Sequence, residues 1–311
     1  MITLAGKKCV ENSIRRFIMD DFSAAERRIL AYMKTGTKFF FKGKEYTVEL
    51  SGKPTCYKGE PKTDIYILAN SLEDKKEIKI SYKKENADFI ENKMSDERAE
   101  QLFGDDWTSV IEQSTKSIED RFNTRMLIYK NGFGRTEKGA ITLGWKYELL
   151  NKLGGELSGK MDLSKEQIID VYTGSNLSDD KKNAMVNGVI IENSGVANYI
   201  LMNEAVSMAQ DVIDKMIPIE DYVMMHPEIY FACKALNYRS FKDKWDGNRP
   251  LSVQVEWSVE DSKLVPHLVF DKPLIVRGNE VAERLKKYMK VLNIKNTDDI
   301  DEDNAGTDKI V

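Results

Sequence analysis

The chain has 311 residues, of which 41% are hydrophobic and 32% charged, as is typical of a globular protein with an ample apolar core. The formal net charge of −4 argues against nucleic-acid binding through bulk positive charge, and no apolar run reaches the ~20 residues of a membrane-spanning helix. Three scattered cysteines and no secretory signal argue against a disulfide framework, so we expect a cytoplasmic protein with no membrane partner.

The hydrophobic pattern predicts alternating helices and strands along the chain. In the first part we expect a helical region over residues 6–33, a strand or hairpin over 39–50 that turns at Lys42–Gly43–Lys44, and strands over 62–67 and 76–81. Helices over 86–103 and 105–129 follow, then a basic glycine-rich loop over 130–139 and a strand over 140–145. The remainder predicts helices over 164–172, 178–186, 203–216 and 281–292, and strands over 251–257 and 264–270.

These elements indicate an α/β (α+β) protein with two halves. We expect a catalytic core over residues 1–150 and an accessory, DNA-binding region over 151–297. Between Asp298 and Asp308 the chain carries six acids and no base, so residues 298–311 are expected to form a disordered acidic tail.

The strands over 62–67 and 76–81 carry the strongest chemical signal. Asp64 opens the first strand, and Glu77 and Lys79 share one face of the second, because side chains alternate at period two. A hairpin would bring Asp64 back towards Glu77. Two carboxylates and a lysine are what magnesium-assisted phosphodiester cleavage requires. Acid-x-lysine triplets are common in this chain, and a solvated surface ion pair is the competing interpretation.

This hairpin resembles the active site of the PD-(D/E)XK nuclease superfamily, in which an Asp at the start of one strand precedes (D/E)xK on the next. Asp64 would be the first acid, with Glu77 and Lys79 completing the motif 77 − 64 = 13 positions later. Pro61 lies three residues before Asp64, which departs from the motif. The resemblance covers residues 1–95. It implies a restriction-endonuclease-like mixed sheet flanked by helices, with an additional mixed C-terminal half, and a Mg²⁺ (or Mn²⁺) ion held by Asp64, Glu77 and an acid of the preceding helix, for which Glu11 is the candidate.

Several basic and aromatic residues are candidates for nucleic-acid contact. Cations alternate with aromatic side chains over residues 234–249, and a glycine-rich loop around Arg135 could approach a phosphate closely. For each, a solvated or partly buried surface is the equally supported alternative. The candidates are Ser81, Lys83, Lys84, Arg135, Arg239, Lys242 and Lys244.

Together these features predict a magnesium-dependent DNA endonuclease of a bacterial cell or of a phage that infects one. Double-stranded DNA is the favoured partner, and a homodimer is expected if both strands are cut at one site. The alternative is a non-catalytic nucleic-acid-binding or interaction protein on a nuclease-like scaffold.

Overall fold

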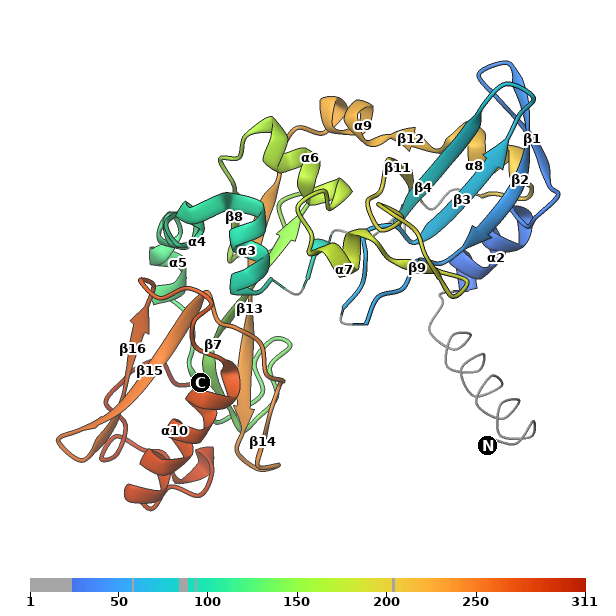
Figure 1. The fold of residues 1–311 in the computed structure, drawn as a ribbon. Helices are drawn as coiled ribbons and strands as arrows, with labels where there is room; N and C mark the ends of the chain where they lie inside the picture. Colours follow the sequence, from blue (N-terminus) through green and yellow to red (C-terminus); the bar gives the residue numbers. More distant parts are fainter. Residues whose placement is uncertain (1–23, 58, 84–88, 93, 203–204) are drawn as a thin grey trace, which may run out of the picture. The chain divides into compact units, whose positions relative to one another are not determined.

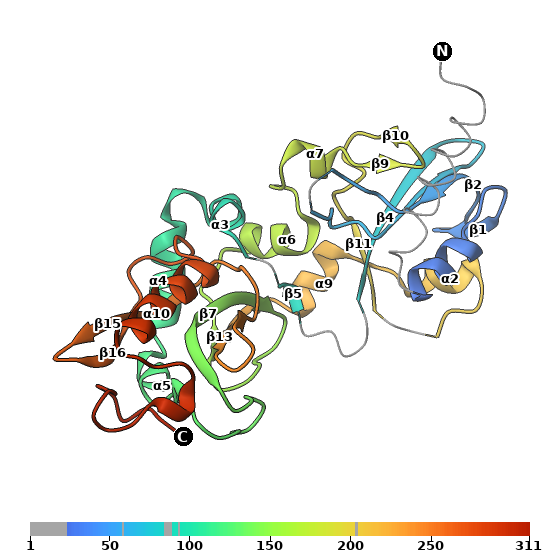
Figure 2. The same ribbon diagram turned by 90° about the horizontal axis from the view of Figure 1, so that it is seen from below.

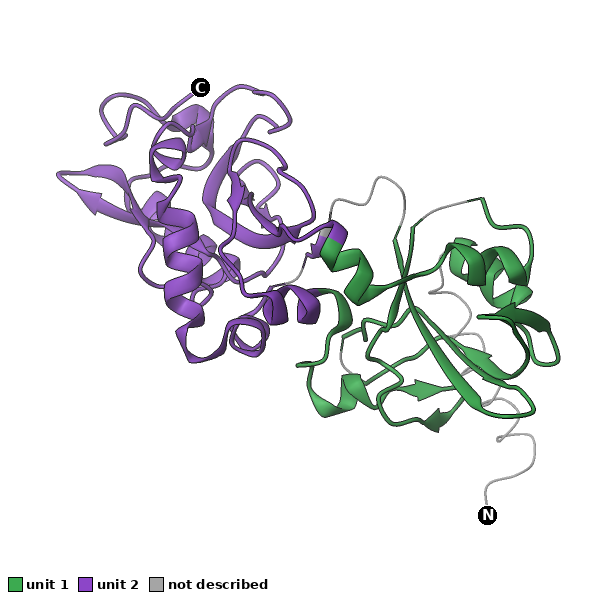
Figure 3. Cartoon of the chain, turned by 90° about the horizontal axis from the view of Figure 1, so that it is seen from above, with its two compact units in different colours: residues 1–86, 172–224 green, residues 87–171, 225–311 purple. Residues whose placement is uncertain are grey.

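The computed structural model describes residues 24–57, 59–83, 89–92, 94–202 and 205–311. The chain forms two compact units, and each is built from two separate segments (Figure 3). Unit 1 contains residues 1–86 and 172–224, and unit 2 contains residues 87–171 and 225–311. The mixed α/β class is confirmed, whereas the division does not follow the expected boundary at residue 150.

Unit 1 is organised by a mixed sheet (Figure 1). Its strands, in spatial order, are β1 (Lys38–Phe41), β2 (Lys44–Gly52), β3 (Ile65–Asn70), β4 (Lys75–Lys83), β11 (Tyr199–Met202) and β12 (Ile217–Pro218). Neighbours from β1 to β4 are antiparallel, β11 is parallel to β4, and β12 is antiparallel to β11. The predicted turn between β1 and β2 is confirmed, with φ of 50° at Lys42 and 79° at Gly43.

The core of unit 1 lies between this sheet and two helices. One face of β3 and β4 carries Ile65, Ile67, Ile78 and Ile80, all at 0% exposure. These side chains pack with the apolar faces of α2 (Ala24–Tyr32) and α8 (Ala209–Lys215), which contact each other (Figure 2). The period-two pattern of the hairpin therefore encodes its buried face.

The structure of residues 178–190 differs from the predicted one. The helix predicted over 178–186 is shorter than expected: α7 spans Asp179–Lys182. It is followed by a hairpin of β9 (Met185–Val186) and β10 (Val189–Ile190). Asn187 and Gly188 have φ of 50° and 87°, the conformation that an Asn-Gly hairpin turn adopts readily. The neighbouring helices are α6 (Lys165–Thr173) and α9 (Ile219–Met225).

Unit 2 is built on the long antiparallel pair of β7 (Ala140–Leu150) and β13 (Tyr230–Arg239). On the other side of β13 lies β14 (Lys244–Trp245); on the other side of β7 lie β15 (Val253–Glu260) and then β16 (Lys263–Val269). The short strands β5 (Phe89–Glu91) and β6 (Ile128–Tyr129) also pair with β7, and β8 (Ser158–Lys160) pairs with β13. Its helices are α3 (Asp96–Phe103), α4 (Trp107–Lys116), α5 (Glu119–Asn123) and α10 (Gly278–Val291), with 3₁₀ turns over Gly104–Asp106 and Thr297–Asp299.

One prediction for unit 2 was wrong and one strand was not predicted. The helix expected over 105–129 is broken into α4, α5 and β6. Near the break the Ser114 and Thr115 hydroxyls donate to the helix's own carbonyls and the Ser117 hydroxyl donates to Ser114 O, a competition that weakens helices. Residues 234–239, the first part of the basic and aromatic stretch over 234–249, belong to strand β13, which was not predicted from the sequence.

The acidic C-terminal segment is ordered, contrary to prediction. Asn296 and Asp299 form a capping box, and Asp298 pairs with Lys138 at 2.9 Å. Ile300 is fully buried, and Ala305 and Ile310 form isolated bridges with Leu264 and Ile128. The acids therefore serve as caps and ion-pair partners, and apolar residues between them anchor the segment.

Substitution of Ile67 tests this account of the unit 1 core. We expect Ile67→Ala to lower the free energy of unfolding by about 2–5 kcal/mol, because it opens a cavity on the fully buried face of β3. Leu72→Ala, in the exposed loop of the same hairpin, should change it by less than about 0.5 kcal/mol. Urea unfolding followed by circular dichroism measures both, and equal losses would contradict the assigned core face.

Candidate active site

The predicted hairpin exists, and its register decides which residues meet. Ile65 lies opposite Ile80, Tyr66 opposite Lys79, and Leu68 opposite Glu77. The same register continued by one residue places Asp64 opposite Ser81, and the Asp64 N–H donates to Ile80 O at 2.9 Å. Four strand positions, or about 14 Å, therefore separate Asp64 from Glu77 along the hairpin. The expected convergence of Asp64 with Glu77 and Lys79 does not occur.

Glu77 and Lys79 do share a face, as predicted, and they fasten a neighbouring segment to the sheet. Glu77 Oε2 lies 4.0 Å from Lys79 Nζ, and Glu77 Oε1 accepts a hydrogen bond from the Tyr66 hydroxyl at 2.6 Å. Lys79 Nζ donates to Asn193 O at 3.0 Å. The Asn198 side chain accepts from Lys79 N and donates to Glu77 O. Only 12% of the Lys79 side chain is exposed, and this burial lowers its pKa.

Asp64 lies at the other end of the hairpin, where β3 begins and β4 ends. Its Oδ2 accepts a hydrogen bond from the backbone N–H of Tyr82 at 2.7 Å. Burial raises the pKa of this carboxyl to about 6, a shift opposed by the nearby Lys83 and by the Tyr82 hydrogen bond. Such a raised pKa is frequent among carboxylates in functional sites.

Two more charged groups act on Asp64 from other parts of unit 1. Glu26 of α2 raises the pKa of Asp64 further, and Lys53, which directly follows β2, lowers it. Lys53 Nζ and Glu26 Oε2 form an ion pair at 3.0 Å, with 18% and 13% of the side chains exposed. We call Glu26, Lys53, Asp64 and Lys83 the Asp64 cluster.

Glu26 was not among the predicted site residues. From the sequence, the acid of the preceding helix was assigned to Glu11, which lies outside the described residues. The resemblance places an additional acid on a helix that precedes the hairpin. Applied to the second part of the helical region predicted over residues 6–33, this expectation could have identified Glu26.

The Asp64 cluster contains two carboxylates, which are too few for a closed, all-protein metal site. Among the described residues no group of three or more His, Cys, Asp or Glu side chains is arranged to hold a metal. Glu26 and Asp64 supply two carboxylates. Magnesium is commonly bound by one or two carboxylates together with water and substrate phosphate oxygens.

The three residues at the end of β4 that were predicted to contact nucleic acid, Ser81, Lys83 and Lys84, differ in their surroundings. Lys83 belongs to the Asp64 cluster. Ser81 is only 2% exposed and its hydroxyl has no hydrogen-bond partner within the described part of the chain, so it is not placed to contact a phosphate. Lys84 lies outside the described residues.

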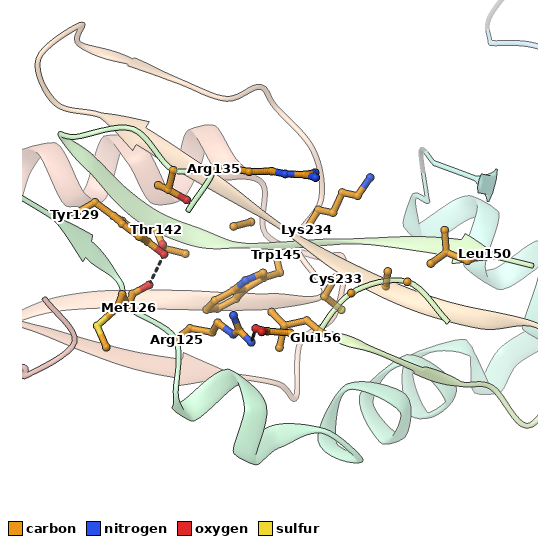
Figure 4. Close-up of a pocket in the computed structure, with 16 residues that line it drawn as sticks. Arg125, Met126, Tyr129, Arg135, Thr142, Trp145, Leu150, Glu156, Cys233 and Lys234 are labelled. Carbon is orange, nitrogen blue, oxygen red and sulfur yellow. Dashed lines mark hydrogen bonds and ion pairs between the residues drawn. The ribbon is translucent and has the colours of Figure 1, made fainter. Parts of the chain in front are cut away.

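The predicted nucleic-acid residues of unit 2 are partly used in ion pairs. Arg239 pairs with Asp246 through two hydrogen bonds of 2.9 and 3.0 Å, and Lys242 pairs with Glu137 at 2.8 Å. Lys244 is exposed on β14. Arg135 lines a pocket of about 660 Å³, which Figure 4 shows in close-up.

Comparison with known proteins adds no assignment. The chain matches no family model, no curated protein and no solved structure. No helix within the described ranges combines the length and the apolar character needed to cross a membrane.

The raised pKa of Asp64 predicts a specific dependence of stability on pH. Folding raises this pKa from 3.8 to about 6, so the protonated carboxyl is favoured in the folded state. Its stabilising contribution is complete below about pH 4 and is lost as the pH rises through about 6. The shift corresponds to at most about 3 kcal/mol, reduced by the solvent that still reaches the carboxyl.

Asp64→Asn keeps a side-chain oxygen to accept from Tyr82 N and cannot ionise. We therefore expect wild type to lose stability relative to this variant between pH 4 and 7, as measured by urea unfolding at each pH. A difference that stays constant across this range would show that Asp64 titrates normally.

Proposed function

We propose that the protein is a magnesium-dependent DNA endonuclease whose catalytic centre is the Asp64 cluster. The observation that carries this proposal is the partly buried Asp64 carboxyl. Its pKa is raised to about 6, a backbone N–H fixes its orientation, and Lys83, Glu26 and Lys53 act on it from three other elements. Nucleases of this kind need carboxylates and a cation at one point, and this is the point of the hairpin where such groups gather.

Each member of the cluster has a role in this proposal. Asp64 and Glu26 would hold Mg²⁺ or Mn²⁺, which when bound supplies charge neutralisation at the scissile phosphate and a more acidic water. Lys83 provides positive charge near the phosphate oxygens as negative charge develops on them. The Tyr82 N–H holds the Asp64 carboxylate in a fixed orientation, so less reorganisation is needed during the reaction.

This assignment keeps Asp64 from the sequence motif and replaces its partners. Because β4 ends beside Asp64, its last residue, Lys83, takes the role expected for Lys79, and Glu26 takes that of the second acid. Glu77 and Lys79 are then structural, since the Glu77 carboxylate accepts from the Tyr66 hydroxyl and the Lys79 ammonium donates to Asn193 O.

One observation favours the alternative of a nucleic-acid-binding protein without catalysis. Lys53 already pairs with Glu26 in a largely buried contact. A metal ion would have to compete with this ammonium group for the same carboxylate. If Glu26 stays paired with Lys53 and binds no metal ion, the protein binds DNA and does not cut it.

Cleavage assays with matched variants decide between these proposals. We expect wild type to cut plasmid DNA with Mg²⁺ or Mn²⁺ and to lose all cutting in EDTA. Asp64→Asn and Lys83→Met should each lower the rate by about 100-fold or more, since they remove a charged group at the reacting phosphate.

Glu77→Gln is the control, because it keeps the shape of a polar residue at the other end of the same hairpin. We expect it to cut within a few-fold of wild type. If wild type binds DNA and cuts nothing with either metal, the non-catalytic alternative holds. If Glu77→Gln is as inactive as Asp64→Asn, the centre lies at the original motif.

A further inference from the structure

The loop between β6 and β7 presents an aromatic and a cationic side chain on a tight turn. Phe133 and Thr136 exchange two backbone hydrogen bonds of 3.0 Å, and Gly134 between them has a φ of 58°, which glycine adopts without steric penalty. Phe133 is 58% exposed. Arg135 is also exposed and forms no ion pair or hydrogen bond within the described part of the chain.

Contacts with distant residues hold this loop in place. Glu137 pairs with both Arg239 and Lys242, and Lys138 pairs with Asp298. The Ser240 N–H donates to Gly139 O at 2.8 Å. These contacts use most of the neighbouring cations to fix the loop, so Phe133 and Arg135 are presented on a rigid support, and little entropy is lost when a ligand binds them.

A pocket of suitable size lies beside Arg135. Its volume is about 660 Å³, within the range of about 300–1,000 Å³ typical of ligand pockets. Arg135, Thr136 and Lys234 line it together with apolar side chains that include Trp145. Figure 4 shows Arg135 and Lys234 in this lining, together with the ion pair of Arg125 with Glu156. Lys234 Nζ pairs with Glu148 Oε2 at 3.0 Å, so Arg135 is the lining cation that this nucleotide-sized pocket offers to a phosphate.

We propose that this part of unit 2 binds unpaired nucleotides of a nucleic-acid strand. An exposed aromatic ring stacks on a base only where that base is not already stacked in a duplex, and Phe133 offers such a ring. Arg135 binds an adjacent phosphate, and the pocket accepts a base or sugar next to it. The site is separate from the Asp64 cluster and requires no metal.

Binding in EDTA tests this site independently of cleavage. Fluorescence anisotropy would follow the full-length protein binding a labelled 20-nucleotide single strand and the duplex of the same sequence. We expect tighter binding of the single strand. Phe133→Ala should weaken it roughly 5–150-fold, which corresponds to the loss of about 1–3 kcal/mol for one stacked base. Arg135→Ala should weaken it and reduce the slope of log K against log salt by about 0.7, the value for one phosphate contact.

The controls remove similar groups elsewhere. Phe40→Ala removes an exposed ring of unit 1, and Lys287→Ala removes an exposed positive charge on α10 of unit 2. Both should bind like wild type, and circular dichroism should show all four variants folded. Equal or tighter binding of the duplex, or wild-type affinity in both loop variants, would overturn the proposal whatever the outcome of the cleavage assays.

Discussion

The register of the β3–β4 hairpin is the constraint on which the rest of unit 1 depends. A slip of one residue would exchange the two faces of a strand, so a buried face specifies register strongly. Here Ile65 pairs with Ile80 and Ile67 with Ile78, and all are fully buried against α2 and α8. The position of Asp64 at the end of β4 is thus a consequence of core packing, and the Asp64 cluster forms where that end meets α2 and Lys53.

The parallel pairing of β4 with β11 explains why the units are discontinuous. Parallel neighbours need a long crossover, and in this chain the connection from β4 to β11 includes the first segment of unit 2. Where β11 returns to the sheet, Asn198 bonds the backbone on either side of Ile78, and Lys79 bonds Asn193. The Lys79 ammonium, which its spacing from Glu77 suggested for catalysis, therefore binds the returning chain, and the Glu77 carboxylate bonds the Tyr66 hydroxyl within the hairpin.

In unit 2, several of the basic side chains that the sequence shows in clusters form ion pairs with acids from distant segments. Basic residues cluster in two segments, yet Glu137 pairs with both Arg239 and Lys242, and Asp298 pairs with Lys138. The acidic C-terminal segment is ordered partly by this pairing. A count of charges along the chain overstates the free positive surface, and Arg135 stands out because the contacts around it leave it exposed.

The sequence by itself determined the mixed α/β class, the hairpin with an acid at its start, most helices, and the strands β1, β2, β7, β15 and β16, because these follow from local periodicity and turn residues. Only the tertiary structure decided the register, since alternation assigns faces and leaves the offset between strands open. It also decided the partners of Asp64, because Glu26, Lys53 and Lys83 come from three other segments of the chain that only the fold brings close to Asp64. The order of residues 298–311 likewise depends on contacts with distant segments, which local composition does not report.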